Sequence, residues 1–479
     1  MKNVDVVVIG GGLLGCFAAR NLCRRNLHIA LLEAREDVCT GISRANTAIV
    51  YSGYDHKPGT LKAEMCVRAN ARFDALCREM DVPFSRCGSL MVSFGPQADA
   101  VLQKKYENGL SMGVPGLRLL TGEEAAAMEP SLAAGVSSTL YAPTAGTVNP
   151  WELGIAASEN AAANGAELCL NTRVQGIRRT MEGYRVETDH GDFSCRAVVN
   201  CAGINADRVQ ALLFPTPVRI APDAADYLIL DKTSANKPSH IIQYEPEDGG
   251  KGFNAVPTVE GSLLLGPSER ENEVDFAASE EGLSFVRERA GSVLPGLDLN
   301  DTIRSFAAVR PNPQREDGSS IGSFVIEHPG PAFWSLIGIK TPGLTCADEL
   351  GRYLADKLAD ELGAEENPTF DPCRPGIRRA RDLPLSQRAA LIRENAAYGE
   401  IVCPCEDVTK AEILEAIRRG AVSVDGVKRR VGAGMGHCQG SRCARAVMEL
   451  LAEELGIPVN AVRKDGPGSE ILEGGDGKN

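Results

Sequence analysis

Residues 4–22, VDVVVIGGGLLGCFAARNL, decide the fold of the amino-terminal part of the chain. The first six are a β-branched run of the kind that forms a strand buried on both faces. Gly10, Gly12 and Gly15 then follow in the spacing G-x-G-x-x-G, and the residues after them are apolar at helical period. A second strand is expected directly before Glu33, about 20 positions after the glycines. The stretch therefore predicts a βαβ unit that binds a dinucleotide.

The three glycines have separate physical roles in such a unit. Gly10 permits the tight turn after the strand, Gly12 lets a pyrophosphate approach the main chain, and Gly15 lets helix and strand pack closely. The amino terminus of the helix then faces the phosphates, and Glu33 accepts hydrogen bonds from ribose hydroxyl groups. The alternative is a tight turn in an α/β domain that holds no ligand.

Three separated segments favour FAD over NAD as the dinucleotide. Residues 40–62 form a long loop of small and polar residues, which suits a flat isoalloxazine ring lying against backbone. Residues 197–207 (AVVNCAGINAD) and 334–345 (WSLIGIKTPGLT) each indicate a strand followed by a turn. Their convergence on one ligand predicts a discontinuous FAD-binding domain. The further candidate cofactor-binding residues are Ser43, Ala45, Asn46, Val174, Ala202, Gly203, Gly338, Gly343, Leu344 and Thr345.

The fold class predicted for the first 364 residues is α/β, or α+β when an inserted antiparallel sheet is counted. Short strands such as 89–94 and 262–265 alternate with turns, which suits a sheet that caps the flavin and supplies the pocket wall. The acidic stretch 266–275 is expected to be a solvated loop. The expected boundaries are 1–80, 146–217 and 326–364 for the Rossmann-like FAD-binding domain, and 81–145 and 218–325 for the substrate domain.

Charge and hydropathy narrow the class of partner. The chain has 479 residues, with 51 Lys and Arg against 64 Asp and Glu, and its net charge of -13 opposes binding to nucleic acid or to anionic membrane surfaces. An anionic substrate must therefore be held by a local cation. No signal peptide is visible, and no apolar run reaches the ~18 residues needed to cross a bilayer. We expect a cytoplasmic protein without a transmembrane segment.

Several segments carry a resemblance to a known family. The stretches at 42–70 (ISRANTAIVYSGYDHKPGTLKAEMCVRAN), 141–153 (YAPTAGTVNPWEL) and 307–313 (AAVRPNP) resemble the D-amino-acid-oxidase superfamily of flavoproteins. Within it the nearest matches are the anaerobic glycerol-3-phosphate dehydrogenase group and the L-2-hydroxyglutarate oxidases. The likeness covers roughly residues 1–370. It implies a flavin that takes a hydride at N5 from a carbon bearing a hydroxyl or amino group.

The resemblance ranks the candidate substrates. Oxidation of glycerol 3-phosphate to dihydroxyacetone phosphate is the first expectation, and oxidation of L-2-hydroxyglutarate is the second. Oxidation of an amino acid or an opine uses the same flavin geometry with an amine donor. The alternative to an enzyme is a redox or assembly subunit whose pocket no longer catalyses a reaction.

Two cations are candidates for the substrate site. Arg310 matches the family's arginine before proline, and its guanidinium binds carboxylate or phosphate bidentately; the alternative is a surface or structural arginine. Lys340 lies beside the Pro-Gly turn expected under the flavin, where a cation stabilises the reduced anionic ring. Its alternative is a solvated lysine.

The proton acceptor departs from the family pattern. Tyr51 stands where related chains usually carry histidine, and a neutral imidazole suits proton abstraction at neutral pH better than a phenol. Either Tyr51 acts indirectly, or His56 or a residue of the substrate domain such as His240 takes the proton. Tyr54 is expected to line the pocket or to be a packing residue.

Four of the fifteen cysteines form a separate pattern near the carboxyl end. One residue separates Cys403 from Cys405, and four residues separate Cys438 from Cys443. Between the two pairs, from Cys405 to Cys438, lie 32 residues. Zinc knuckles prefer two to four residues between paired cysteines, so C-x-C fits one tetrahedral ion poorly. Two irons bridged by sulfide can use all four thiolates. The pattern favours a 2Fe-2S cluster, with zinc and a redox-sensing thiol set as alternatives.

The segment around these cysteines resembles the bacterioferritin-associated-ferredoxin-like domain. Thr409 with Glu412 predicts a capping box that opens one helix, and Ser441 is expected to cap another. We expect a linker at 365–398, this small helical domain at 399–460 and a disordered tail at 464–479. The combination implies electrons leaving a flavin singly through the cluster into a partner protein subunit. Any attachment to a membrane would be through such a partner.

Overall fold

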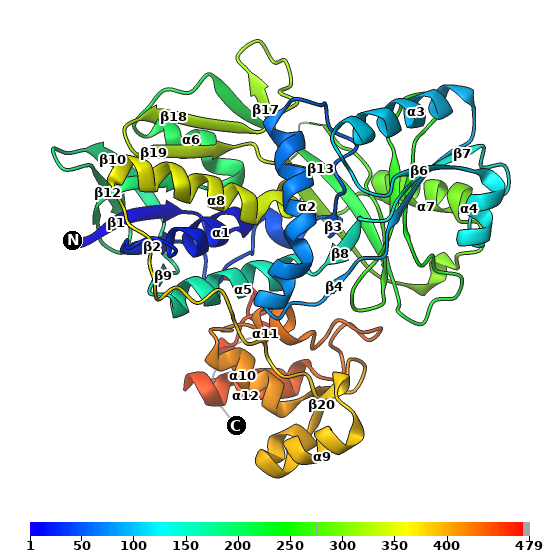
Figure 1. Cartoon of the computed structure of the whole chain (residues 1–479). Helices are drawn as coiled ribbons and strands as arrows, with labels where there is room; N and C mark the ends of the chain where they lie inside the picture. Colours follow the sequence, from blue (N-terminus) through cyan, green and yellow to red (C-terminus); the bar gives the residue numbers. More distant parts are fainter. Residues whose placement is uncertain (272, 274–275, 473–479) are drawn as a thin grey trace. The chain divides into compact units, whose positions relative to one another are not determined.

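The computed structural model describes residues 1–271, 273 and 276–472. The chain divides into two compact units (Figure 1). The first consists of Met1–Ala34 and Val38–Arg374, and the second of Arg35–Asp37 together with the described part of Pro375–Asn479.

A mostly parallel sheet is the centre of the first unit. Strand β1 (Lys2–Ile9) lies between β2 (Ile29–Leu32) and β12 (Phe193–Asn200) and is parallel to both. The sheet continues in parallel to β9 (Glu167–Cys169) and β19 (Phe333–Ile337). Its antiparallel margins are β10 (Val174–Arg179), β11 (Tyr184–Thr188) and β18 (Val325–Gly330).

The β-branched residues of β1 are buried on both faces of this sheet, as the sequence predicts. Val6 and Val8 pack in one hydrophobic cluster, and Val7 and Ile9 pack in another on the opposite face. Helix α1 (Leu13–Leu22) packs against α5 (Pro150–Ala163) and α8 (Gly343–Leu362), and these contribute to the first cluster. Figure 1 shows α8 running alongside α1. Short helix α6 (Ala206–Ala211) follows β12.

A second sheet provides the wall expected of the substrate domain. Its strands are antiparallel neighbours except for one parallel pair, β14 with β5. The order is β17 (Thr302–Arg315), β13 (Val218–Leu230), β16 (Leu263–Gly266), β15 (Phe253–Pro257), β14 (Ile241–Tyr244), β5 (Ser89–Ser93), β7 (Ser138–Ala142) and β6 (Arg118–Thr121). The remaining elements of this region are β3 (Ile49–Val50), β4 (Phe84–Ser85), β8 (Gly146–Val148), α2 (Leu61–Glu79), α3 (Pro96–Ser111), α4 (Gly122–Met128) and α7 (Glu280–Val293). The predicted fold class is confirmed.

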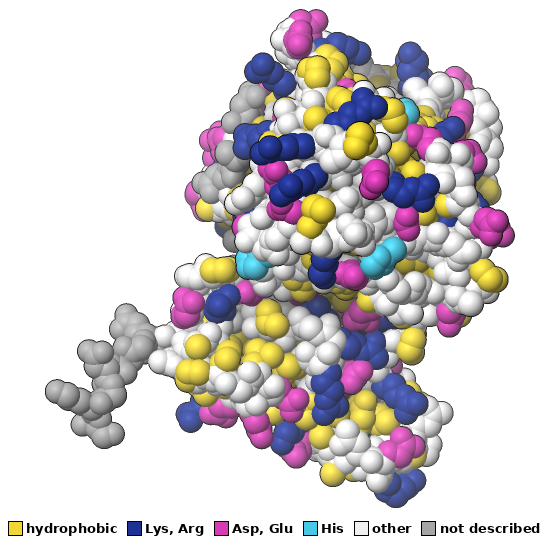
Figure 2. Space-filling model, turned by 90° about the vertical axis from the view of Figure 1, so that its left-hand side faces the viewer, with side chains coloured by type: hydrophobic (Ala, Val, Ile, Leu, Met, Phe, Trp, Pro, Cys, Tyr) yellow, Lys and Arg dark blue, Asp and Glu magenta, His cyan; other side chains and the backbone are white. Residues whose placement is uncertain are grey.

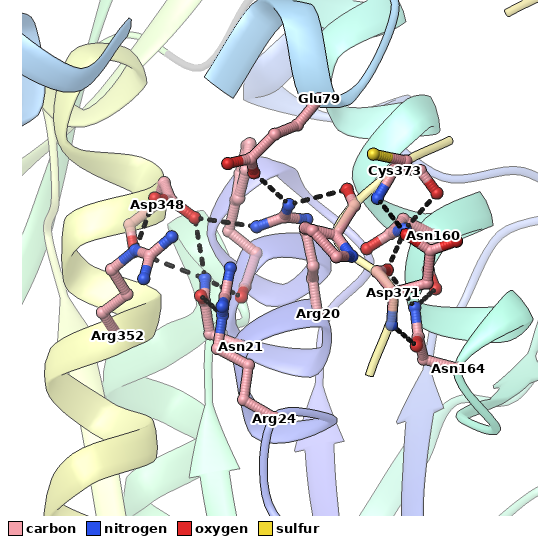
Figure 3. Close-up of polar contacts among 12 residues, drawn as sticks. Arg20, Asn21, Arg24, Glu79, Asn160, Asn164, Asp348, Arg352, Asp371 and Cys373 are labelled. Carbon is pink, nitrogen blue, oxygen red and sulfur yellow. Dashed lines mark hydrogen bonds and ion pairs between the residues drawn. The ribbon is translucent and has the colours of Figure 1, made fainter. Parts of the chain in front are cut away.

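A buried polar network holds the last residues of the first unit (Figure 3). Arg20 on α1 is fully buried and donates to Glu79, to Asp348 and to the carbonyl of Pro372. Asn160 on α5 donates to the carbonyl groups of Asp371 and Cys373. The beginning of the segment expected to be a linker is therefore bound to two helices of the dinucleotide-binding region.

The second unit is a small helical domain with one short hairpin. Its strands are β20 (Ile401–Cys403) and β21 (Val408–Thr409), and its helices are α9 (Leu385–Glu394), α10 (Lys410–Arg418), α11 (Val424–Val431) and α12 (Ala444–Leu455). Helix α9 lies inside the segment 365–398, for which the sequence predicted only a linker. The capping box of Thr409 and Glu412 opens α10 as predicted. The prediction for Ser441 is wrong, because α12 begins after Cys443, which precedes it without a side-chain cap.

Three residues from the amino-terminal region belong to the second unit. Asp37 accepts hydrogen bonds from Arg429 and Arg430, both on α11, at 2.8–2.9 Å. All three side chains are buried. Glu36 accepts from Arg463 at 2.7 Å. Of the expected tail, Lys464 bonds to the backbone of Ser469, and residues 473–479 lie outside the described residues.

Charge is divided unevenly between the units. Residues 35–37 and 375–479 contain 17 Lys and Arg and 17 Asp and Glu, so the first unit accounts for the whole net charge of -13. Figure 2 shows one face of the molecule, on which acidic and basic side chains are interspersed. Among the described helices, none is long and apolar enough to cross a membrane.

Candidate functional site

The glycine-rich turn between β1 and α1 has the geometry of a phosphate cradle. Gly10 has φ +102°, and a Cβ atom there would lie 2.5 Å from the carbonyl oxygen of Cys201. A Cβ atom on Gly15 would lie 1.8 Å from the carbonyl oxygen of Gly10. Gly12 precedes α1, and the nearest atom to a Cβ there is Ser43 Oγ at 3.3 Å. Packing alone requires Gly10 and Gly15, whereas Gly12 leaves the helix amino terminus approachable by an anion.

Side chains expected to hold the cofactor border this turn. Glu33, directly after β2, accepts a hydrogen bond from the backbone amide of Gly11 at 2.7 Å. Ser43 Oγ accepts from the amide of Leu13 at 2.9 Å, so the loop 42–46 lies against the start of α1. Asn46 in turn donates to the carbonyl of Ser43 at 3.0 Å, and Ala45 ends the short turn Ile42–Arg44.

The two later segments join the same region. Ala202 and Gly203 follow β12, and a Cβ atom on Gly203 would lie 3.6 Å from the side chain of Ile42. Thr345, in the first turn of α8, accepts a hydrogen bond from the amide of Tyr51 at 3.0 Å. The three separated segments therefore converge as the sequence predicts.

The remaining candidate cofactor residues lie at strand and helix ends. Gly338 follows β19 with φ +64°, and a Cβ there would lie 2.6 Å from the ring of Pro313. Gly343 begins α8, and Leu344 packs against the hydrophobic cluster that contains α1. Val174 begins β10, where it pairs with Thr188. Their contacts with a cofactor stay predictions.

Arg310 lies on β17 among charged groups that the sequence did not connect with it. Its Nη2 atom donates to the carbonyl oxygen of Ser268 at 3.3 Å and lies 3.6 Å from Glu269 Oε1. The same Glu269 oxygen lies 2.9 Å from Lys251 Nζ. Within the described part of the chain, Arg310 Nε is buried and has no hydrogen-bond partner. A buried N–H group in this state fits a ligand that accepts a hydrogen bond.

Lys340 joins this group through β17. Its Nζ atom donates to Asn312 Oδ1 at 2.6 Å, and Asn312 also donates to Asp223. Asn312 lies two residues beyond Arg310 on the strand, so both side chains leave the same face. Arg310, Lys340 and Lys251, together with Glu269, are called the cation cluster below.

The positive charges of the cation cluster repel one another. Burial, and then the charge of Arg310, lower the pKa values of Lys251 and Lys340. Burial opposes ionisation of Glu269 as well, but Lys251 and Arg310 hold the pKa of this carboxyl below its usual value. An anion bound beside Arg310 would relieve the repulsion among the cations.

The two tyrosines and two histidines proposed for proton transfer lie in different surroundings. Burial raises the pKa of Tyr51 to about 12, although the nearby charge of Arg310 opposes the shift. Tyr54 is buried and donates to Gln243 Oε1 at 2.8 Å, and burial raises its pKa further. Both phenols are therefore protonated at neutral pH. His240 Nδ1 lies 2.9 Å from Glu129 Oε2, beside β14.

His56 lies beside a pair of buried thiols. Hydrogen bonds from Cys346 and then from His56 lower the pKa of the Cys66 thiol to about 6, against the effect of burial. The Nε2 atom of His56 is buried and makes no hydrogen bond to any residue that the structure describes. The Cys66 thiol donates to the carbonyl oxygen of Tyr51 at 3.6 Å. His56 therefore lies near Tyr51, but its catalytic role stays a prediction.

Sequence reasoning missed part of the cation cluster. Glu269 falls in the stretch 266–275, which was expected to be solvated, and Ser268 in this stretch is buried and bonds to Asp226. Asn312 was not considered. The available signal was Gly266-Pro267 directly after the apolar strand at 262–265, since a stiff turn after a buried strand places the next residues near the sheet edge.

The four carboxy-terminal cysteines form an inner and an outer pair. Cys403 and Cys443 are buried, whereas Cys405 and Cys438 are half-buried with their sulfur atoms 3.5 Å apart. A hydrogen bond from Cys443, joined by backbone amides that include Gly434, lowers the pKa of Cys403 to about 6. In the described ranges, no three His, Cys, Asp or Glu side chains surround a single metal-ion position. Four cysteines with amides aimed at sulfur are the donor set of an iron-sulfur cluster.

Glycines bring the two cysteine loops together. A Cβ atom on Gly436 would lie 2.6 Å from Cys405 Cβ, so no larger residue fits between the loops there. Gly434 and Gly440 have φ values of +87° and +90°, which side chains rarely adopt. Gly432 ends α11 in the left-handed conformation.

Comparison with known families identifies both parts of the chain. Residues 5–357 match the family described as FAD dependent oxidoreductase, and residues 401–453 match the BFD-like [2Fe-2S] binding domain. The first match covers most of the chain, so the protein belongs to the FAD dependent oxidoreductase family. The predictions of FAD and of a 2Fe-2S cluster are confirmed at the level of these families.

Particular relatives place the chain within the family. It is 40% identical over 480 residues to a protein of Caloramator mitchellensis named glycerol 3-phosphate dehydrogenase, covering 98% of each chain. It is 28% identical over 378 residues to the human mitochondrial L-2-hydroxyglutarate dehydrogenase, covering 68% of this chain and 81% of that one. A solved structure of L-alpha-glycerophosphate oxidase from Mycoplasma pneumoniae with FAD bound has a TM-score of 0.72 at 22% identity. The match covers 78% of this chain and 99% of the oxidase chain. The structural likeness supports the fold.

Proposed function

We propose that the protein is a dehydrogenase that oxidises the secondary alcohol of glycerol 3-phosphate to the ketone dihydroxyacetone phosphate. The observation that carries the proposal is the buried Nε atom of Arg310 among the cations of the cluster. The full-length relative named for this activity supports it.

The cation cluster suits a phosphate monoester. Such a group carries between one and two negative charges near neutral pH and presents three acceptor oxygens. Arg310 can donate through its fork while Lys251 and Lys340 supply point charges, and the field of the acidic first unit is overcome locally. An uncharged alcohol would leave the repulsion among the three cations in place.

The residues around the glycine turn fit FAD, which would accept a hydride from the substrate carbon. Gly12 and the amino terminus of α1 would hold its pyrophosphate, and Glu33 its ribose hydroxyl groups. The turn before α8 would lie at the flavin ring, with Lys340 as the nearby cation. These assignments are residue-level proposals supported by the convergence of the three segments.

Oxidation of the alcohol releases two electrons and two protons, one of them from the hydroxyl group. The phenols of Tyr51 and Tyr54 are protonated at neutral pH, so neither is ready to accept that proton. We propose His56 as the acceptor, because its buried Nε2 atom has no partner among the described residues. His56 also contacts Cys66, whose thiol donates to the carbonyl oxygen of Tyr51. Tyr51 would then orient the substrate.

The second unit would carry the electrons away. The four cysteines would hold a 2Fe-2S cluster, which would supply one-electron transfer and so suits a protein acceptor. We propose that this acceptor is a separate protein and that the enzyme works in the cytoplasm, with contact to a membrane only through a partner.

One anaerobic titration tests the activity. The purified protein is mixed with glycerol 3-phosphate, L-2-hydroxyglutarate, glycine or proline, and flavin absorbance is followed. Bleaching with glycerol 3-phosphate alone supports the proposal. Bleaching with L-2-hydroxyglutarate alone would assign the second candidate, which the human relative favours. A protein that holds FAD and is bleached by none of these donors would contradict both and support a subunit without catalysis.

A further inference from the structure

Helix α9 of the second unit exposes a stripe of apolar side chains. Leu385 and Ile392 are 82% and 40% exposed, and exposed Ala389 lies between them at helical spacing. Leu391 is the buried residue of this helix. Ile401, which is 48% exposed, lies two residues before Cys403. An apolar helix face of this kind next to a redox site indicates a contact surface.

Two arginines attach α9 and the turn before it to the first cysteine loop. Arg381 donates to the carbonyl oxygen of Glu406 at 3.0 Å. Arg388 on α9 lies 3.2 Å from the carboxylate of Asp407. Both acceptors directly follow Cys405, so the apolar stripe has a fixed position relative to the cysteines.

Of the four cysteines, only the outer pair, Cys405 and Cys438, is partly exposed to solvent. Cys405 and Cys438 are half-buried, and their neighbours His437 and Arg442 are exposed, whereas Cys403 is fully buried. A group held by all four thiolates therefore comes nearest to solvent beside Cys405 and Cys438. An electron acceptor must approach this side.

The two sequence segments that carry α9 and the second cysteine loop contain more basic than acidic residues, although the first unit is acidic. Residues 375–400 contain five arginines and three acidic residues, and residues 436–446 contain two arginines and no acidic residue. Arg378 and Arg445 are 70% and 91% exposed, although each forms a surface ion pair, with Glu394 at 3.7 Å and Glu449 at 2.9 Å. Arg393 is exposed as well. The first unit has 34 basic and 47 acidic residues, so the sign of the charge changes at this region.

We propose that the α9 stripe, with Arg393 and Arg445, is the docking surface for a one-electron carrier protein whose contact face is acidic. An apolar centre with a charged rim is the usual anatomy of a transient protein interface, and opposite charge speeds association. This inference rests on the proposed function, because that reaction supplies the electrons. Each alcohol oxidised to a ketone yields two electrons and two protons, and two carriers are each reduced by one electron.

Reduction of two haem proteins of opposite charge tests the surface. The full-length holoenzyme with glycerol 3-phosphate is given the acidic soluble domain of cytochrome b5, basic cytochrome c, or a small phenazine dye. The variant pair Arg393→Glu with Arg445→Glu should lower kcat/KM for cytochrome b5 at least tenfold and raise it for cytochrome c. The variant pair Leu385→Ser with Ile392→Ser should also lower kcat/KM for cytochrome b5. Dye reduction and iron content should be unchanged in both.

Matched controls lie on the first unit. Arg72→Glu on α2 and Leu110→Ser on α3 change an exposed arginine and a leucine that is 51% exposed, and should leave every rate unchanged. Equal cytochrome b5 reduction by wild type and both variant pairs, or no reduction by wild type while the dye is reduced, would overturn the docking surface. Binding to phosphatidylglycerol vesicles that only the arginine variants lose, with unchanged cytochrome b5 reduction, would assign the surface to lipid and overturn it too. Failure of the dye assay with glycerol 3-phosphate would instead overturn the proposed function.

Discussion

Arg20 on α1 and Asp348 on α8 form an ion pair of 3.3 Å in which Arg20 is fully buried and Asp348 is nearly so. The two helices begin at the glycine turn and at the Pro-Gly turn, which both border the proposed flavin site. The pair therefore joins the two helices that follow these turns (Figure 3).

Removal of one member of this pair should destabilise the first unit. Arg20→Met leaves Asp348 buried with Arg352 as its remaining arginine, and we expect a loss of about 3–5 kcal/mol in the free energy of unfolding. Urea denaturation followed by circular dichroism measures it. Arg25→Ala is the control, because its partner Asp356 is 68% exposed and such pairs contribute only about 0–1 kcal/mol. Equal losses in the two variants would contradict a special role for Arg20.

Arg310 should control substrate affinity. Arg310→Ala removes a donor from a partly buried charge contact, so we expect the KM for glycerol 3-phosphate to rise about 30-fold or more, which corresponds to about 2 kcal/mol. Steady-state kinetics with the phenazine dye measure it. Arg315→Ala, at the exposed end of the same strand, should have the wild-type KM. A wild-type KM in Arg310→Ala would exclude this residue from the pocket.

Glu269 should compete with the substrate for the cations. Its carboxylate contacts Lys251 and Arg310, so Glu269→Gln increases the positive potential of the cation cluster. We expect the KM for glycerol 3-phosphate to fall about threefold to tenfold, equivalent to about 1 kcal/mol. A higher KM would mean that Glu269 positions Lys251 rather than competing with the anion.

The affinity for the substrate should rise with pH in the acidic range and fall again in the alkaline range. The phosphate monoester loses its second proton at a pH of about 6, so affinity should rise through that region. Lys251 and Lys340 bind the anion only when protonated, and their pKa values are lowered, so affinity should fall at a lower alkaline pH than an ordinary lysine would give. In Lys340→Arg the charge persists at high pH, and the alkaline limb should move upward. Profiles of kcat/KM from pH 5 to about 10 test both limbs.

Cys405 should be needed for electron exit but not for substrate oxidation. Cys405→Ser removes one of the four thiolates, and we expect loss of bound iron and of cytochrome b5 reduction, with dye reduction by the flavin retained. Iron analysis and visible absorbance measure the cluster directly. Cys87→Ser, a cysteine of the first unit, is the control. Full iron content in Cys405→Ser would remove this residue from the ligand set.

The dinucleotide-binding region was predictable because its physical requirements are local. Gly10 and Gly15 have no room for a side chain, and Val6 to Ile9 must be buried on both faces, so each position limits the residue types directly. The four cysteines were predictable for the same reason, since their spacing and chemistry suffice.

The cation cluster could be predicted only in part. Arg310 and Lys340 were found by resemblance and by a turn signal, but Glu269 comes from a stretch whose composition indicates a solvated loop. Its contact with Lys251 depends on the pairing of strands far apart in sequence, which no local pattern shows. Helix α9 was missed because its outward face is apolar and only Leu391 is buried, so its periodicity is weak.

The assignment of Arg35–Asp37 to the second unit limits how the molecule can be divided by genetic engineering. A fragment starting at residue 375 lacks Asp37, so the guanidinium groups of Arg429 and Arg430 lose this counter-ion. The ferredoxin-like domain therefore cannot be transferred to another protein as one continuous segment. Its transplantation into another oxidoreductase would require grafting three residues into the loop after the recipient's second strand.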